Sequence, residues 1–100
     1  MNIGGYDKNL YAINAVNGTM LWKFQTSGDL TASPPTLSSD GKTVYVGSKD
    51  ANLYAINTLD GTKFWNYKTG SHVSSSPALS SDGKTVYVGS RDNNLYAINT

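Results

Sequence analysis

The hexapeptide NLYAIN at positions 52–57 decides the fold, because it occurs three times in a chain of 100 residues. The other two copies begin at Asn9 and Asn94, which lie 43 residues before Asn52 and 42 residues after it. The segment LSSDGKTVYVGS, which begins at Leu37, recurs at Leu79. One unit of about 42 residues is therefore repeated along the chain.

The repeat consists of short runs rich in Tyr, Val, Ile and Thr, separated by Gly, Asn, Asp and Ser, which is typical of strands joined by tight turns. The four strands of one unit are predicted at residues 31–38, 43–48, 52–57 and 62–68. Asp40-Gly41 and Asp60-Gly61 are predicted to form two-residue hairpin loops in which both central residues have positive φ. The Ser- and Thr-rich segments at 31–39 and 74–81 are interpreted as innermost strands rather than as linkers. No segment shows the 3.6-residue apolar spacing of a helical repeat, so the period predicts four-stranded antiparallel β-propeller blades in an all-β fold.

The strand count divides the chain into a partial blade at 1–30 (the second to fourth strands), a complete blade at 31–72 and a partial blade at 73–100 (the first to third strands). A closed propeller needs about four to eight blades, so we expect closure by head-to-tail homo-oligomerisation with shared blades. A tetramer would give eight blades and a trimer six. Either a fourth strand from the next chain or a first strand from the previous chain would complete a sheet, and which of the duplicated copies pairs stays open.

Two eleven-residue segments resemble a known motif. AINAVNGTMLW (12–22) and AINTLDGTKFW (55–65) are similar to the tryptophan-docking motif of pyrroloquinoline-quinone-type propellers. The resemblance implies that each Trp packs between its own blade and the next, against the small Ala of the motif and the Gly peptide of a neighbour. It assigns structural blade-docking roles to Ala12, Gly18, Trp22, Ala55, Gly61 and Trp65. A Trp at such a position buries a large surface, so replacing Trp65 by Ala is predicted to cost about 3–5 kcal/mol.

Composition excludes several classes of function. Charged residues make up 15% of the chain and its formal net charge is +1, which argues against a partner recognised through charge, such as nucleic acid. No apolar run has the length of a membrane span, and the N-terminus has no signal-peptide pattern, so no membrane insertion is expected. Cys is absent, so the redox compartment cannot be read from the sequence. The family resemblance alone suggests a periplasmic or other extracytoplasmic location.

The residues that carry chemistry are assigned to turns. Glu and Cys are absent, and every Asp except Asp29 occupies a turn position that recurs along the chain. His72 is the only His and is predicted to be an exposed loop residue. The family that the chain resembles includes quinone-dependent dehydrogenases. In those enzymes the residues that bind the quinone and calcium, and the Asp base, lie in loops outside the repeat. No catalytic, cofactor-binding or metal-binding residue is therefore predicted.

Three hypotheses for function remain. The first is a non-catalytic, self-assembling scaffold that binds a protein or small ligand on a propeller face. It is favoured by the near-identity of residues 35–58 and 77–100, which differ at three positions only, because a specialised site requires blades that diverge. The alternatives are a fragment of a quinone-dependent dehydrogenase and a fragment of an envelope assembly-factor propeller.

Overall fold

A computed structural model of the chain describes residues 2–6, 8–30 and 34–100. This part of the chain forms strands and turns, and it contains no helix long and apolar enough to cross a membrane. The strands are β1 (Asn2–Tyr6), β2 (Asn9–Ile13), β3 (Met20–Gln25), β4 (Thr36–Leu37), β5 (Thr43–Gly47), β6 (Asn52–Asn57), β7 (Lys63–Lys68), β8 (Ala78–Leu79), β9 (Thr85–Gly89) and β10 (Leu95–Asn99).

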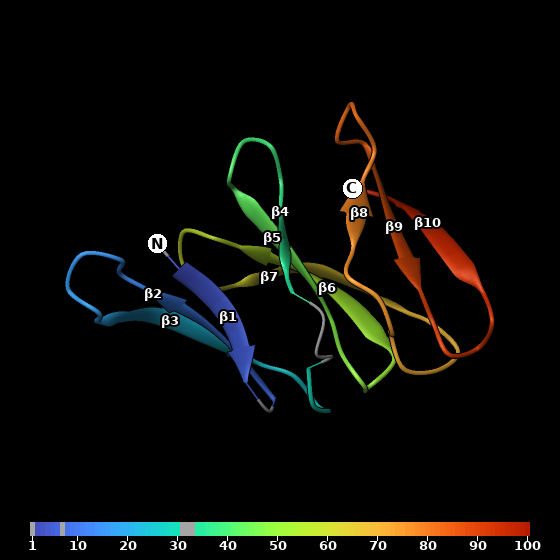
Figure 1. Ribbon diagram of the computed structural model, residues 1–100, viewed down its shortest axis with the longest axis horizontal. Helices are drawn as coiled ribbons and strands as arrows, with labels where there is room; N and C mark the ends of the chain where they lie inside the picture. The colour runs from blue at the N-terminus through green and yellow to red at the C-terminus, as the bar shows by residue number, and fades with distance from the viewer. Residues whose placement is uncertain (1, 7, 31–33) are drawn as a thin grey trace.

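The strands form three antiparallel sheets that lie side by side in chain order (Figure 1). The first has the order β1-β2-β3, the central one β4-β5-β6-β7 and the third β10-β9-β8. Strands that follow one another in sequence are therefore neighbours in each sheet, as in the blade of a propeller. The predicted all-β architecture of four-stranded antiparallel blades is confirmed, with one sheet of four strands and two sheets of three within the described residues.

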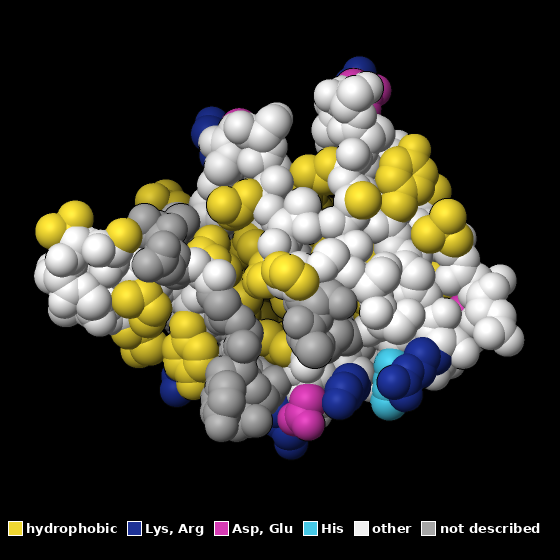
Figure 2. All heavy atoms as spheres, viewed as in Figure 1, with side chains coloured by type: hydrophobic (Ala, Val, Ile, Leu, Met, Phe, Trp, Pro, Cys, Tyr) yellow, Lys and Arg dark blue, Asp and Glu magenta, His cyan; other side chains and the backbone are white. Residues whose placement is uncertain are grey.

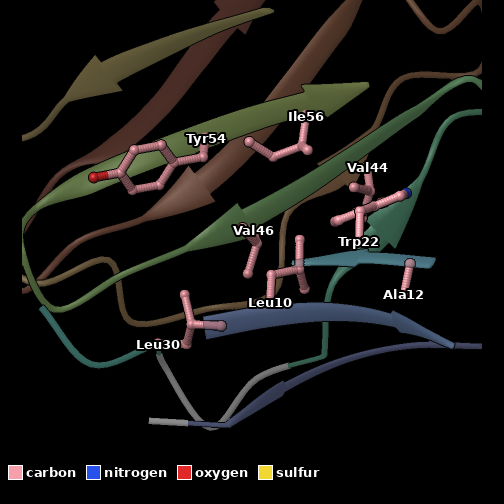
Figure 3. Packing of buried hydrophobic residues seen from close by; sticks show 8 residues of the cluster. All are labelled: Leu10, Ala12, Trp22, Leu30, Val44, Val46, Tyr54 and Ile56. Carbon is pink, nitrogen blue, oxygen red and sulfur yellow. The ribbon is translucent and has the colours of Figure 1, made fainter. Parts of the chain in front are cut away.

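The hydrophobic core is divided between the two junctions of the central sheet. Successive residues of a strand point to opposite faces, so β5 supplies both junctions in alternation. Val44 and Val46 pack toward the first sheet with Leu10 and Trp22, whereas Tyr45 packs toward the third sheet with Val86. Figure 3 shows the first of these clusters. Each blade is thus stabilised mainly by its neighbours, as expected for a repeat architecture.

The predicted innermost strands are present but short. The central sheet begins with β4, which has two residues, although residues 31–38 were predicted to be a strand; residues 31–33 lie outside the described part of the chain. Pro at positions 34 and 35 removes two backbone donors, which limits how far a ladder can extend toward the N-terminus. The segments around β4 and β8 are linked instead by side chains, since the hydroxyl of Thr36 donates to the carbonyl of Pro77 and that of Ser76 to the carbonyl of Pro34.

The turn prediction was wrong in its geometry. In the turns at Asp40-Gly41 and Asp60-Gly61 only the Gly has positive φ, at 71° and 79° respectively. The Asp instead accepts hydrogen bonds inside its own turn, and Oδ1 of Asp60 lies 3.0 Å from the amide nitrogen of Thr62. This arrangement matches a longer hairpin loop that ends on one left-handed Gly. The loop between β5 and β6 has no Gly, and there Ala51 takes the left-handed conformation, with φ of 78°.

Candidate functional site: the seam between two blades

The seam between the first and central sheets is built around Trp22. This residue lies on β3 opposite Ala12 of β2, and its side chain is only 7% exposed. The small Ala12 leaves room for the indole ring, which lies beside Val44 in Figure 3. The ring thus bridges two sheets, and its burial removes a large apolar surface from water.

The polar edge of the Trp22 indole is also satisfied across the seam. Its Nε1–H donates to the carbonyl oxygen of Thr58 at 2.8 Å, and this bond is buried. Gly61 lies in the same turn and presses against the flat face of the ring: a Cβ atom at this position would lie 2.7 Å from Cδ2 of Trp22. A side chain at position 61 is therefore excluded both by its left-handed backbone and by the indole.

The second copy of the motif lies in a different environment. Trp65 is paired in register with Ala55, as Trp22 is with Ala12, but its side chain is only half-buried. Its ring lies 6.0 Å from that of Tyr45, and no described residue accepts a hydrogen bond from its indole. Beside it is a cavity of ≈ 500 Å³ that Trp65 lines together with Asp40, Asp82 and Thr100. Within the described residues, nothing lies within 4 Å of the Cβ position of Gly18.

The structure thus brings together three of the six predicted docking residues, namely Ala12, Trp22 and Gly61, at one seam. Ala55 and Trp65 are paired across β6 and β7 of the central sheet. In the described residues, no Gly turn packs on the Trp65 ring as Gly61 packs on Trp22. Gly18 has the required left-handed conformation, with φ of 73°, but no Trp packs on it in the described part of the chain.

A second, polar contact crosses the same seam. Asp50, in the loop between β5 and β6, accepts hydrogen bonds from the hydroxyl of Tyr54 and from the backbone N–H of Ser27, the latter at 3.1 Å. Ser27 belongs to the loop that leaves the first sheet, so the carboxylate ties the two sheets together. We call Asp50, Tyr54 and Ser27 the aspartate latch.

The latch is repeated at the next seam. Asp92 accepts hydrogen bonds from the hydroxyl of Tyr96 and from the backbone N–H of Gly70, the latter at 2.9 Å. The two Tyr residues were not among the predicted site residues. The pattern Asp-x-Asn-x-Tyr, which occurs at 7–11, 50–54 and 92–96, is the sequence signal that identifies them. Of the first copy, Asp7 lies outside the described residues.

Electrostatics favour the ionised form of the latch. Burial by itself would raise the pKa of Asp50, but the hydrogen bonds from Tyr54, Asn52 and Ser27 outweigh it, and the pKa lies below its usual range. Burial, together with the same carboxylate, raises the pKa of Tyr54. Asp50 is thus a charged acceptor whose hydrogen bonds are fully formed at neutral pH.

The depressed pKa of Asp50 predicts loss of stability in acid. A carboxyl group whose pKa is lower in the folded state stabilises that state above its unfolded pKa, and the contribution disappears as the pH falls through the folded pKa. We therefore expect the free energy of unfolding, measured by urea denaturation, to decrease below about pH 4, the ordinary pKa of Asp. In Asp50→Asn this decrease should be smaller, with the remainder due to other Asp residues. Tyr54→Phe, which keeps the carboxylate and removes one donor, should give an intermediate slope; an unchanged slope in both variants would contradict the assignment.

Three more Asp residues with lowered pKa, Asp40, Asp60 and Asp82, lie in the hairpin turns. The hydroxyl of Ser38 and the N–H of Lys42 lower the pKa of Asp40, and Ser80 with the N–H of Lys84 does the same for Asp82. These contacts are local, because each donor lies two residues from its acceptor. The carboxylates therefore stabilise turns, as the repeat pattern predicted.

His72 differs from the prediction of an exposed loop residue. It is half-buried, and its Nδ1 atom is buried without a hydrogen-bond partner in the described part of the chain. The loop between β9 and β10 lies beside it, since the N–H of Arg91 donates to the His72 carbonyl at 2.9 Å, and Figure 2 shows part of the His side chain at the surface next to Lys and Arg side chains. Among the described residues, no group of three or more His, Cys, Asp or Glu side chains is arranged to hold a metal ion.

Blades of four antiparallel strands, stacked side by side and joined through Trp and Gly, define a chain of pyrroloquinoline-quinone-like propeller repeats. A family model described as outer membrane protein assembly factor BamB matches residues 3–100. The chain therefore belongs to this family of propeller repeats.

Comparison with solved structures agrees on the fold. The crystal structure of BamB from Moraxella catarrhalis superimposes with a TM-score of 0.80 over 97% of this chain, at 12% sequence identity. The chain covers 28% of that structure. A 31-residue stretch is 45% identical to the β-alanine-activating enzyme of Danio rerio, and it represents 31% of this chain and 3% of that protein. The chain thus spans a small part of the proteins that it matches.

Proposed function

We propose that the chain is a non-catalytic binding scaffold of propeller blades that associates with further copies of itself. The non-catalytic role is supported by the hydrogen bonds that the carboxylates of the chain accept. Four carboxylates accept hydrogen bonds that hold a turn or a seam together, namely those of Asp40, Asp50, Asp82 and Asp92. A general base or a metal ligand needs a carboxylate free to meet a substrate or an ion, so this use supports a structural role.

Self-association is supported by the two outermost strands. Within the described residues, no strand pairs with the outer edge of β1 or of β10, and these two strands belong to the sheets on opposite sides of the molecule (Figure 1). An open strand edge offers unpaired backbone donors and acceptors to another chain. Another copy can supply a fourth strand beside β10 or a first strand beside β1. Because these two edges belong to opposite sides, such contacts run head to tail and close into a ring when the rotation per copy divides a full turn.

Particle mass in solution tests this association. Light scattering is expected to give four times the 10.7 kDa of the chain, or three times that value for a six-bladed ring. Leu95→Lys places a charge on the exposed face of the edge strand β10 and should lower the mass, since charged edges resist pairing. Leu59→Asp changes an exposed turn of the central sheet and should leave the mass unaltered. A monomer for the unmodified chain would overturn self-association.

A second candidate, a unit of an outer-membrane assembly factor, is favoured by the family match. The BamB model covers nearly the whole chain, whereas the match to the activating enzyme covers less than a third of it. This role requires that the chain capture a defined protein from a bacterial envelope extract. A dehydrogenase fragment would instead require that pyrroloquinoline quinone, added with calcium, change its absorbance in the presence of the chain, and we expect no change.

A further inference from the structure

An apolar groove crosses the seam between the first and central sheets. It has a volume of ≈ 770 Å³ and is lined by Leu21 of β3, Phe64 of β7, Leu59, and the polar residues Lys42, Asn57 and Thr58. The three hydrophobic side chains are 50%, 52% and 86% exposed, respectively. Three large apolar side chains from two sheets thus lie together at the seam and form one solvent-exposed apolar surface.

The polar atoms at the base of the groove are already engaged in the seam. The carbonyl of Thr58 accepts the Trp22 indole N–H, and its hydroxyl donates to the carbonyl of Gly41 at 2.7 Å. Its N–H donates to the carbonyl of Lys42 at 3.1 Å. These bonds hold the base rigid and leave the hydrophobic side chains as the main free surface, so a ligand here is recognised chiefly by apolar contact.

The cationic side chain of Lys42 lines the groove beside this apolar surface. The Lys42 side chain is exposed, and no carboxylate among the described residues lies within ion-pair distance of its ammonium group. The carboxylate of Asp40, in the same turn, accepts hydrogen bonds from the hydroxyl of Ser38 and the backbone N–H of Lys42, and it attracts the Lys42 ammonium group through space without forming an ion pair. The aliphatic part of a lysine side chain packs well along apolar surface while its charged end meets water or an anion.

We propose that this groove binds an alkyl carboxylate of the fatty-acid class, with the chain against Leu21, Leu59 and Phe64 and the carboxylate at the Lys42 ammonium group. The volume lies in the range of small-molecule sites, which combine apolar surface with few polar groups. The cavity at the next seam differs in chemistry, because Asp40 and Asp82 line it and repel an anion. The inference deepens the proposed role of a binding scaffold by naming a ligand class.

The test is a titration with octanoate, followed by the methyl resonances of Leu21 and Leu59 in NMR spectra. Saturable shifts are expected at these two residues, whereas the methyl groups of Val16, an exposed turn residue outside the groove, should not shift. Octanoate should bind about threefold to fivefold more tightly than octan-1-ol, the upper range for an exposed ion pair. Octyltrimethylammonium should bind more weakly than octan-1-ol, because its charge is opposite.

Matched variants test which residue contacts the alkyl chain of the ligand and which contacts its carboxylate. Leu59→Asp should weaken octanoate binding at least about tenfold, since it removes apolar contact and adds a like charge, whereas Val16→Asp at the equivalent turn should not. Lys42→Met should remove the preference for octanoate over octan-1-ol, and Lys84→Met, at the same position of the next repeat, should keep it. Equal binding of all three ligands, or loss of binding in the Val16 variant, would overturn the proposal. Self-association is measured by mass, so either proposal fails independently of the other.

Discussion

Replacing Trp22 by alanine is expected to lower the free energy of unfolding by about 3–5 kcal/mol, the range for truncating a buried aromatic side chain. The loss combines three effects: a cavity between two sheets, the removed apolar surface, and a buried Thr58 carbonyl without its donor. Urea denaturation followed by circular dichroism measures this change. Because such a loss approaches the whole stability of a small domain, Trp22→Phe provides a second variant that keeps most of the side-chain volume and removes the indole donor.

Trp65→Ala is the matched control for this prediction. The sequence motif treats the two Trp residues alike, and from it the cost of Trp65→Ala is likewise predicted to be about 3–5 kcal/mol. In the structure Trp65 is half-buried, and no described residue accepts a hydrogen bond from it, so its replacement should cost clearly less than that of Trp22. Equal costs in the two variants would show that burial at the seam is not what distinguishes the motif copies.

The seam could be predicted because its residues resemble a known docking motif, and that motif recurs at a fixed period along the chain. The Ala, Gly and Trp of each motif occupy the same positions in both copies, and the strand order follows from short strands joined by tight turns. What a repeat cannot reveal is the environment of each copy. Trp22 has a Gly turn of the next sheet against it and Trp65 has none among the described residues, although their local sequences are nearly the same.

Other features were missed for a different reason. The aspartate latch joins Asp50 to a loop 23 residues earlier in the chain, and a long-range contact of this kind leaves only the local spacing to Tyr54 as a sequence signal. The turn geometry was wrong because an Asp-Gly pair is compatible with more than one hairpin loop. Likewise, the apolar groove combines residues from two repeats, and each of them alone is an ordinary exposed hydrophobic residue.

Gly61 provides the second test of the seam, because its substitution separates backbone strain from steric overlap. Four Gly residues have φ between 71° and 79°, namely Gly18, Gly41, Gly61 and Gly83. Alanine at any of these positions is expected to lower the free energy of unfolding by about 1–2 kcal/mol, because its backbone would be left-handed. At Gly18, Gly41 and Gly83 no described atom lies within 4 Å of the added Cβ. At Gly61 the Cβ would overlap the Trp22 ring, so Gly61→Ala should cost a further ~1–3 kcal/mol for the overpacking.

The double variant Trp22→Ala/Gly61→Ala decides whether this extra cost arises at the seam. Once the indole is absent, the Cβ at position 61 has no ring to displace, and only the backbone strain remains. The cost of Gly61→Ala should then fall to that of Gly18→Ala, giving a coupling energy of about 1–3 kcal/mol between two residues that are 39 positions apart in the chain. If the costs of the two single variants simply add, the ring and the Gly turn do not share a contact, and the stacking of blades through Trp22 would have to be abandoned. Strong coupling would instead show that the Trp22 ring and the Gly61 turn are in direct contact, so that the two sheets are joined by one aromatic ring packed on a turn without a side chain.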